Sequence, residues 1–263
     1  MPTSLEGRIL ALTAAVHLLL GLVALVYLRA DVPLIGGAHP ALKPMKFGIS
    51  IALFLGTMAV VVPMLTTSAS VRVGLAATLS LTMVAEMIAI VTQALRGRAS
   101  HFNMSTAGDN AWWKLMMVAI VVATIAMIAV ATLASIAPLR DRATGGTLDA
   151  LRATAWRAGC WLVILAAASG FAMGGRSRHS IGGDDAGPGI ALLGWSRTHG
   201  DLRVPHFIAL HVLQAVPLAG AILQRLPLPP ALRWIGLAVV LLASAALCVL
   251  SLVSAFAGRP LLR

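Results

Sequence analysis

Long apolar stretches alternate with short polar ones along the whole chain. Each apolar stretch is about as long as a membrane span, which needs roughly 20 apolar residues in a helix. Lipid offers no hydrogen-bond partner to backbone amides, so every spanning segment should be helical. The pattern predicts an all-α polytopic integral membrane helix bundle that forms a single transmembrane domain over residues 1–263. Its seven spans are expected at about 9–28, 47–65, 73–95, 112–136, 158–173, 205–223 and 234–256.

Composition supports the same class. The chain is 59% hydrophobic and only 11% charged, whereas soluble domains carry about 25% charged residues. The net charge is +11, with seventeen arginines against three lysines. Because these charges lie in short loops between apolar stretches, they favour anionic lipid headgroups over nucleic acid as a partner. The expected location is a bacterial-type inner (cytoplasmic) membrane. Cys160 and Cys248 lie inside apolar stretches, which argues against a disulfide framework.

Seven spans place the loops alternately on two faces of the membrane. Three unusual polar segments, residues 39–47, 96–103 and 195–206, fall on the same face, which we call the motif face. This face carries twelve Lys and Arg residues and the other carries eight, which favours a cytoplasmic motif face. The loop 139–157, on the opposite face, holds four arginines and looks cytoplasmic itself. The sequence leaves the orientation open.

Ionisable side chains inside the spans are the first candidates for function. Such groups are costly in lipid and usually mark functional sites. At a rise of about 1.5 Å per residue, Glu86, His211 and His17 lie about 15, 12 and 18 Å below the motif face. Glu86 and His211 are the predicted catalytic residues of a buried His/Glu/Gln centre.

Helical spacing groups these residues further. Glu86 and Gln93 are seven residues apart, on one stripe, and His211 and Gln214 are three apart, on one face. His206 and His211 are five apart, which turns them roughly 140° from each other, so they should serve different partners. The structural alternatives are that the glutamines join helices and that the histidines only hydrogen-bond between them.

Cofactor binding is the more specific hypothesis for these side chains. Imidazoles from different helices can ligate a metal or haem iron, and arginines can hold haem propionates. The cofactor is expected to be haem or a divalent metal, and its identity stays open. The predicted metal ligands are His206, His211 and Glu86, and the predicted cofactor-binding residues are His17, His101, His206, Gln93, Gln214, Arg98, Arg197 and Arg203. For Arg197, Arg203 and Asp201, a loop salt bridge is the structural alternative.

The predicted function is a membrane protein that binds a metal or haem and carries out redox or acid–base chemistry on a lipid-soluble or small-molecule ligand. One alternative is a proton-coupled transporter or channel with Glu86 as the titrating group, although no internal repeat supports a repeat-built transporter. The other is a structural subunit of a membrane complex. No lysine follows Lys114, which excludes a retinal protein. Whether the protein is an enzyme stays open. Glu86→Ala and His211→Ala should abolish activity, while Asp149→Ala should not.

Overall fold

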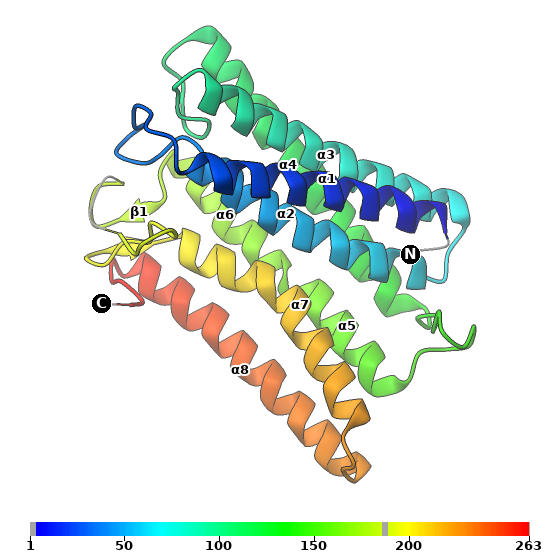
Figure 1. Cartoon of the computed structure of the whole chain (residues 1–263). Helices are drawn as coiled ribbons and strands as arrows, with labels where there is room; N and C mark the ends of the chain where they lie inside the picture. The colour runs from blue at the N-terminus through cyan, green and yellow to red at the C-terminus, as the bar shows by residue number, and fades with distance from the viewer. Residues whose placement is uncertain (1–3, 186–188, 263) are drawn as a thin grey trace. The chain divides into compact units, whose positions relative to one another are not determined.

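The protein is built almost entirely of helices (Figure 1). The structure, a computed structural model, describes residues 4–185 and 189–262. Its elements are α1 (Leu5–Tyr27), α2 (Leu42–Val61), the 3-10 turn η1 (Val62–Met64), α3 (Ala69–Leu95), α4 (Ala107–Ile136), α5 (Ala150–Leu162), α6 (Ile164–Arg176), β1 (Ser180–Ile181), β2 (Gly200–Asp201), α7 (Arg203–Arg225) and α8 (Pro230–Phe256). The predicted all-α class is confirmed.

Within the described ranges, seven helical segments are long and apolar enough to cross a membrane, when α2 is counted with η1 and α5 with α6. Large apolar side chains lie exposed on their surfaces, among them Leu12 (69% exposed), Leu81 (68%) and Leu242 (71%). Exposed apolar surface of this extent belongs against lipid tails rather than water. The protein is therefore an integral membrane protein in contact with lipid.

The fifth span is longer than its apolar stretch predicts. The expected span was 158–173, but the helical segment runs over Ala150–Arg176, with only Val163 between α5 and α6. The predicted span omits the first two turns of α5 because Arg152 and Arg157 interrupt the apolar run. Arg157 donates hydrogen bonds to the carbonyl oxygens of Ala134 (2.8 Å) and Ala137 (3.3 Å). It thereby satisfies carbonyls that the end of α4 leaves without helical partners.

The chain divides into two compact units. Unit 1 comprises Met1–Pro63 and Thr67–Ala126, and unit 2 comprises Met64–Thr66 and Met127–Arg263. Unit 1 therefore contains α1, α2, the first two residues of η1, α3 and the first two thirds of α4, and unit 2 contains the remainder. The single transmembrane domain over residues 1–263 stays a prediction.

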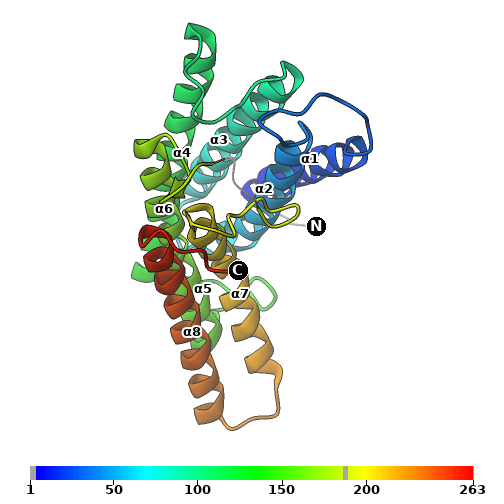
Figure 2. The same cartoon turned by 90° about the vertical axis from the view of Figure 1, so that its left-hand side faces the viewer.

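In unit 1, α1 and α2 lie side by side (Figure 2). Their contact depends on two glycines. A Cβ atom at Gly48 would lie 2.7 Å from the Cα atom of Gly21 and 2.8 Å from the carbonyl oxygen of His17. Small residues at such crossings let two helix backbones approach closely, which is how helices gain packing energy in lipid.

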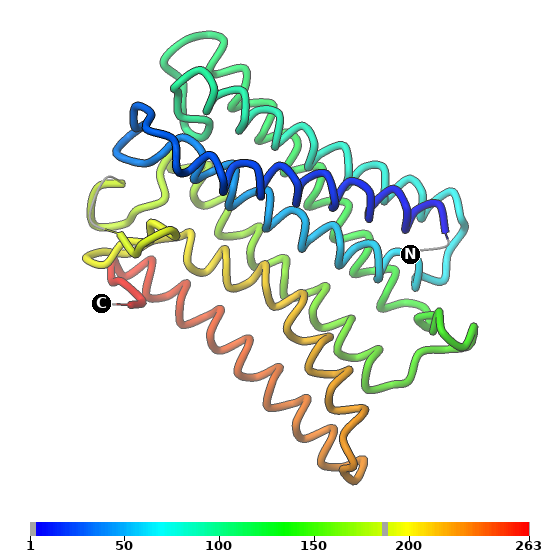
Figure 3. Tube along the Cα trace, in the orientation of Figure 1, coloured from blue at the N-terminus to red at the C-terminus, as the bar shows by residue number. Residues whose placement is uncertain are grey.

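In unit 2, α7 and α8 form a helical hairpin whose short turn can be followed in Figure 3. α5 packs against α7, where Gly159 meets the ring of Pro217: a Cβ atom at Gly159 would lie 3.3 Å from its Cδ atom. The buried core of this unit consists of Leu151, Ala155, Ala166, Ala209, Val212, Val216, Leu237 and Cys248.

A small antiparallel hairpin, absent from the sequence prediction, lies between α6 and α7. β1 pairs with β2 with Ser180 opposite Asp201 and Ile181 opposite Gly200. A Cβ atom at Gly200 would lie only 2.0 Å from the carbonyl oxygen of Ala255, so the hairpin can approach the end of α8 only with glycine at this position. Two-residue strands leave no periodic pattern from which they could be predicted.

Candidate functional site

The chain reverses sharply at the end of α3, and this reversal builds the candidate site of unit 1. Gly97 has a positive φ of 67°. The backbone N–H of Arg98 donates to the carbonyl of Gln93 (2.9 Å), and that of Gly97 donates to the carbonyl of Ala94 (3.1 Å). This pair of bonds is the Schellman motif, which favours glycine at the left-handed position. The segment that follows turns back towards α3.

The reversal brings His101 to the buried carboxyl group of Glu86. Glu86 is only 2% exposed, and its Oε1 atom lies 3.3 Å from His101 Nε2. Within the described residues, Glu86 Oε2 is buried with no hydrogen-bond partner. The other ring nitrogen of His101, Nδ1, lies 3.2 Å from the hydroxyl of Ser100. Both are predicted site residues, but the sequence does not pair them, because a loop residue such as His101 carries no helical periodicity.

Aromatic rings surround this pair. The rings of Phe47 and Trp113 each lie 5.6 Å from the ring of His101, and Phe102 and Trp113 pack edge to face at 5.0 Å. The side chain of His101 keeps 22% exposure, whereas that of Glu86 keeps 2%. His101 therefore lies on the solvent side of the pair, and Glu86 lies on its apolar side. Residues 39–47 and 96–103, two segments of the predicted motif face, meet here.

A second polar cluster lies beside the first, around Asp109. This aspartate is fully buried and accepts a hydrogen bond from Gln93 Nε2 at 2.9 Å. Arg96 and Arg98 both form ion pairs with it, the first at 3.3 Å. Arg96 also donates to Gln93 Oε1 at 2.7 Å. Gln93 and Arg98, predicted as cofactor-binding residues, are thus joined in one network with a carboxylate that the sequence prediction did not include.

A local signal would have found Asp109. The hydroxyl of Thr106 accepts a hydrogen bond from the backbone N–H of Asp109 (3.1 Å) and donates one to its Oδ2 atom (2.7 Å). Threonine followed three residues later by an acidic residue is a helix-capping signature. A carboxylate in the first turn also suits the positive end of the helix dipole. Asp109 therefore fixes the start of α4 and the position of both arginines.

His17 lies deep in unit 1 and is 1% exposed. Its Nδ1 atom lies 2.8 Å from the carbonyl oxygen of Thr13, and its Nε2 atom lies 3.2 Å from that of Met83. A neutral imidazole donates through one nitrogen only, so it can bond to one of these carbonyls at a time. Met83 is one helical turn before Glu86 on α3.

In unit 2, Asp201 holds the loop that leads into α7. Its carboxylate accepts hydrogen bonds from the backbone N–H groups of Ser196 and Arg203, each at 3.0 Å, and from Arg203 Nη2 at 2.6 Å. Burial acts to raise the pKa of Asp201, but the hydrogen bonds and charge of Arg203, with the backbone N–H groups, hold it below its ordinary value. The loop salt bridge, which was the structural alternative for Arg203, is present.

The two histidines of α7 contact different partners, as their spacing predicts. His206 Nδ1 lies 2.7 Å from the carbonyl oxygen of Ala166 on α6. His211 hydrogen-bonds to the side chain of Gln214 and packs edge to face on Phe207, with ring centroids 4.2 Å apart. His211 and Gln214 therefore form the pair that their spacing predicts.

The described residues offer little for a metal. Residues 4–185 and 189–262 contain no group of three or more His, Cys, Asp or Glu side chains that could hold a metal ion. Within the described part of unit 2, His206 and His211 have separate partners and belong to no group of three possible ligands, so they do not form a metal centre by themselves. Glu86 belongs to unit 1 and both histidines to unit 2, so the three-residue metal site stays a prediction.

Comparison with models of protein families, with curated proteins and with solved structures gave no match. The geometry of the two units is therefore the basis for the function of this chain.

Proposed function

We propose that unit 1 contains an acid–base centre for a lipid-soluble ligand, with Glu86 as the group that meets the ligand and His101 as the group that exchanges its proton with the motif face. The observation that carries this proposal is that the two carboxyl oxygens of Glu86 have different surroundings. Oε1 faces His101 at 3.3 Å, while Oε2 is buried and lacks a hydrogen-bond partner among the described residues.

A buried polar atom without a partner costs about 1–3 kcal/mol, and more when it is charged. An O–H or N–H group of a bound ligand would remove that cost by donating to Oε2. The ligand proton can then pass to Glu86, and a proton can pass from Glu86 Oε1 to His101 Nε2 and from there to water. Phe47, Phe102 and Trp113 supply an apolar setting for the rest of such a ligand.

This proposal replaces haem or metal binding as the function that the geometry supports best. Several residues nominated as ligands contact protein atoms instead: both ring nitrogens of His17 and Nδ1 of His206 face backbone carbonyls. Haem binding and redox chemistry stay predictions, which a visible absorption spectrum of the oxidised and reduced protein would test. The bacterial-type inner membrane, proposed from the arginine-rich short loops, is likewise part of this proposal.

Infrared spectroscopy of the protein in lipid bilayers tests the acid–base centre directly. The wild type should show the band of a buried carboxyl group that changes when a phenolic ligand such as decylhydroquinone is added, Glu86→Gln should lack this change, and His101→Gln should alter it. Asp31→Asn is the matched control, because Asp31 is an exposed carboxylate of the same unit. A band that survives unchanged in Glu86→Gln would overturn the proposal.

The ligand is tested with decylhydroquinone, which donates through two phenolic O–H groups, and with its dimethyl ether, which cannot donate. The hydroquinone should quench tryptophan fluorescence, since Trp113 lies 5.6 Å from His101. Losing a hydrogen bond to a charged group costs about 1.5–3 kcal/mol. Binding should therefore weaken roughly tenfold or more both in Glu86→Gln and with the ether. Equal binding of the two probes would exclude a donor bond to Glu86.

A proton-coupled carrier is the second candidate function. One observation favours it: polar groups continue through unit 1 beyond Glu86, from His17 beside the Met83 carbonyl to the Glu6–Arg72 ion pair at 2.9 Å. In vesicles containing a pH-sensitive dye, the wild type should then carry protons inward and Glu86→Gln should not. Equal proton fluxes in both would remove this candidate.

A further inference from the structure

The stretch of chain that carries His101, residues 99–105, is held at both ends by one buried carboxylate. We call this stretch the His101 segment. Before it, the guanidinium group of Arg98 forms an ion pair with Asp109 Oδ2. After it, the hydroxyl of Thr106 donates a hydrogen bond to the same oxygen at 2.7 Å. Asp109 is fully buried, so water competes little for these contacts.

The other oxygen of Asp109 joins the His101 segment to α3. Asp109 Oδ1 accepts a hydrogen bond from Gln93 Nε2 at 2.9 Å. Gln93 Nε2 also lies 3.4 Å from the carbonyl oxygen of Ala99, where the segment begins. The same carbonyl accepts a hydrogen bond from Asn103 Nδ2 at 2.9 Å, which closes the segment on itself. One carboxylate therefore connects the end of α3, the start of α4 and both ends of the segment.

The backbone of the His101 segment needs such support. Phe102, next to His101, has a φ of 59°, in the left-handed region that a bulky side chain rarely adopts. A conformation of this kind costs free energy and persists only where the surrounding structure holds it. The ring of Phe102 packs on Trp113 at 5.0 Å. Release of either end of the segment would let Phe102 return to an ordinary backbone conformation, and His101 would move with it.

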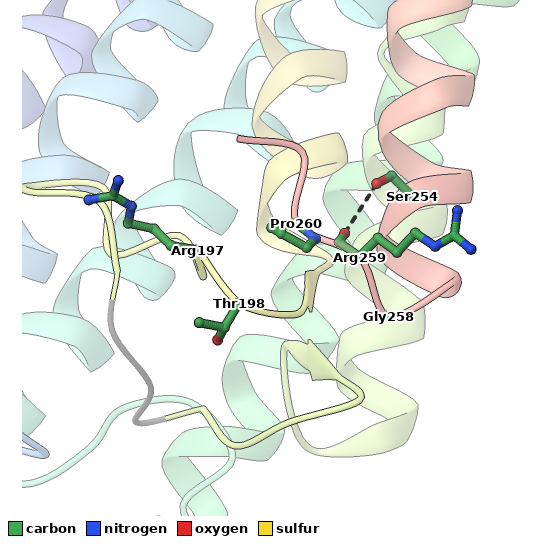
Figure 4. Close-up of a pocket in the computed structure, with 6 residues that line it drawn as sticks. All are labelled: Arg197, Thr198, Ser254, Gly258, Arg259 and Pro260. Atoms are coloured by element: carbon green, nitrogen blue, oxygen red, sulfur yellow. Dashed lines mark hydrogen bonds between the residues drawn. The ribbon is translucent and has the colours of Figure 1, made fainter. Parts of the chain in front are cut away.

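The arginines beside Asp109 differ from those at the end of α8. In unit 2, a cavity at that end is lined by Arg197, Thr198, Ser254, Gly258, Arg259 and Pro260. Figure 4 shows the guanidinium groups of Arg197 and Arg259 pointing outward in opposite directions. The hydroxyl of Ser254 already donates to the carbonyl oxygen of Arg259 at 3.1 Å. Those two arginines diverge, whereas Arg96 and Arg98 converge on one carboxylate.

We infer that Asp109 is a positioning residue of the acid–base centre. Its carboxylate joins both ends of the His101 segment to α3 and so keeps His101 Nε2 3.3 Å from Glu86 Oε1. This inference rests on the proposed function, in which His101 exchanges the proton of Glu86. Asparagine cannot replace Asp109 here. It keeps one acceptor oxygen and places an N–H donor where the other oxygen was, so either Gln93 or Arg98 loses its acceptor.

Labelling of Ser100→Cys measures whether the His101 segment leaves α3. Ser100 is 4% exposed, so the introduced thiol should react slowly with a water-soluble maleimide while the segment is in place. The native cysteines are buried. In the full-length protein in detergent, adding Asp109→Asn should speed this labelling about tenfold or more, since losing a hydrogen bond to a charged group shifts the opening equilibrium by that factor. Unchanged labelling would overturn the inference.

Glu6→Gln is the matched control. Glu6 is another buried carboxylate of unit 1 (4% exposed), paired with Arg72 at 2.9 Å near the opposite end of α3. Added to Ser100→Cys, it should leave the labelling slow. Equal acceleration by Glu6→Gln and Asp109→Asn would show a general loosening of unit 1 and overturn the inference. Arg98→Gln and Arg98→Lys provide a second test if Asp109→Asn folds poorly: the first should speed the labelling, and the second, which keeps the charge, should restore most of the protection. Equal labelling in these two variants would contradict the role of Asp109.

Infrared spectra connect the His101 segment to the chemistry. In Asp109→Asn, the change that decylhydroquinone causes in the buried carboxyl band should be altered as it is in His101→Gln. The double variant Asp109→Asn/His101→Gln should match His101→Gln alone, because a residue that acts through His101 has no further effect once His101 is replaced. A further change in the double variant would overturn the positioning role. A wild type without the ligand-dependent change would overturn the proposed function instead, and the labelling rates would still decide whether Asp109 holds the segment.

Discussion

Asp201 and Asp109 show how single residues of this chain stabilise buried negative charge. Each carboxylate is held by several donors within one short stretch of chain: Arg203 and backbone N–H groups for Asp201, and Gln93, Thr106 and two arginines for Asp109. Removing either carboxylate leaves buried donors without an acceptor, the Gln93 amide at Asp109 and the backbone N–H of Ser196 at Asp201, and an unsatisfied buried donor costs about 1–3 kcal/mol. We therefore expect both aspartates to be sensitive to substitution by alanine.

The lowered pKa of Asp201 predicts an acid-dependent loss of stability. A carboxylate with a lowered pKa in the folded state contributes stability above the ordinary aspartate pKa of about 3.9 and loses it as the pH falls through the lowered value. Asp201→Asn should therefore lose less stability than the wild type between about pH 7 and about pH 3. Thermal unfolding followed by circular dichroism measures this. Asp31→Asn should follow the wild type, and parallel pH profiles for all three proteins would contradict the assignment.

Glu86→Ala and His211→Ala are still expected to abolish activity, but Asp149→Ala, their control, is expected to affect stability. The structure shows Asp149 as the N-cap of α5, where its side chain accepts a hydrogen bond from the backbone N–H of Arg152 at 3.0 Å. Replacing an aspartate N-cap by alanine costs about 1 kcal/mol. Asp149→Ala should thus lower the melting temperature and leave activity per folded molecule unchanged. Asp149→Ser, which restores the cap, should recover the wild-type melting temperature.

At the scale of elements, α1 and α2 of unit 1 cross closely at Gly48. A Cβ atom there would press on the backbone of Gly21 and His17. The atoms that must move are backbone atoms, so relief is difficult. Gly48→Ala should destabilise unit 1 by about 1–3 kcal/mol, the usual cost of overpacking.

Gly56 of the same helix supplies the control. No atom lies within 4 Å of a Cβ built there. Gly56→Ala should be neutral or stabilising by up to about 1 kcal/mol, since alanine has the higher helix propensity. Thermal unfolding of both variants separates steric from propensity effects. Equal melting temperatures for the two variants would show that the helices do not cross as closely as described.

At the scale of the whole molecule, seven spans predict that successive loops alternate between the two sides of the membrane. Asp31 and Leu262 should then lie on the motif face, and Ala143 on the other. Single cysteines at these three exposed positions can be labelled in sealed vesicles with a reagent that does not cross lipid. Asp31→Cys and Leu262→Cys should react alike and Ala143→Cys oppositely. The buried native cysteines should stay unlabelled. Identical labelling of all three would contradict the three spans between Asp31 and Ala143 and the three between Ala143 and Leu262.

The sequence by itself determined the class of the protein and the approximate place of each span, because in lipid the length of an apolar run dictates a helix. It also identified Glu86, His101, Gln93, Arg98 and the His211–Gln214 pair as polar positions that need an explanation. The fifth span shows the limit of prediction from apolar runs. In the sequence, the charge of Arg157 indicates a loop, whereas in the structure Arg157 lies in α5 and contacts the end of α4.

Tertiary structure alone decided which polar groups of different segments meet. His101 reaches Glu86 because the Schellman turn at Gly97 folds a loop back towards α3, and periodicity within one helix cannot encode a contact made by a loop. The burial of Glu86 Oε2 and, within the described residues, its lack of a hydrogen-bond partner are likewise set by the tertiary structure. Both features depend on distances between segments far apart in the chain, which the hydrophobic pattern and the residue spacing leave undetermined.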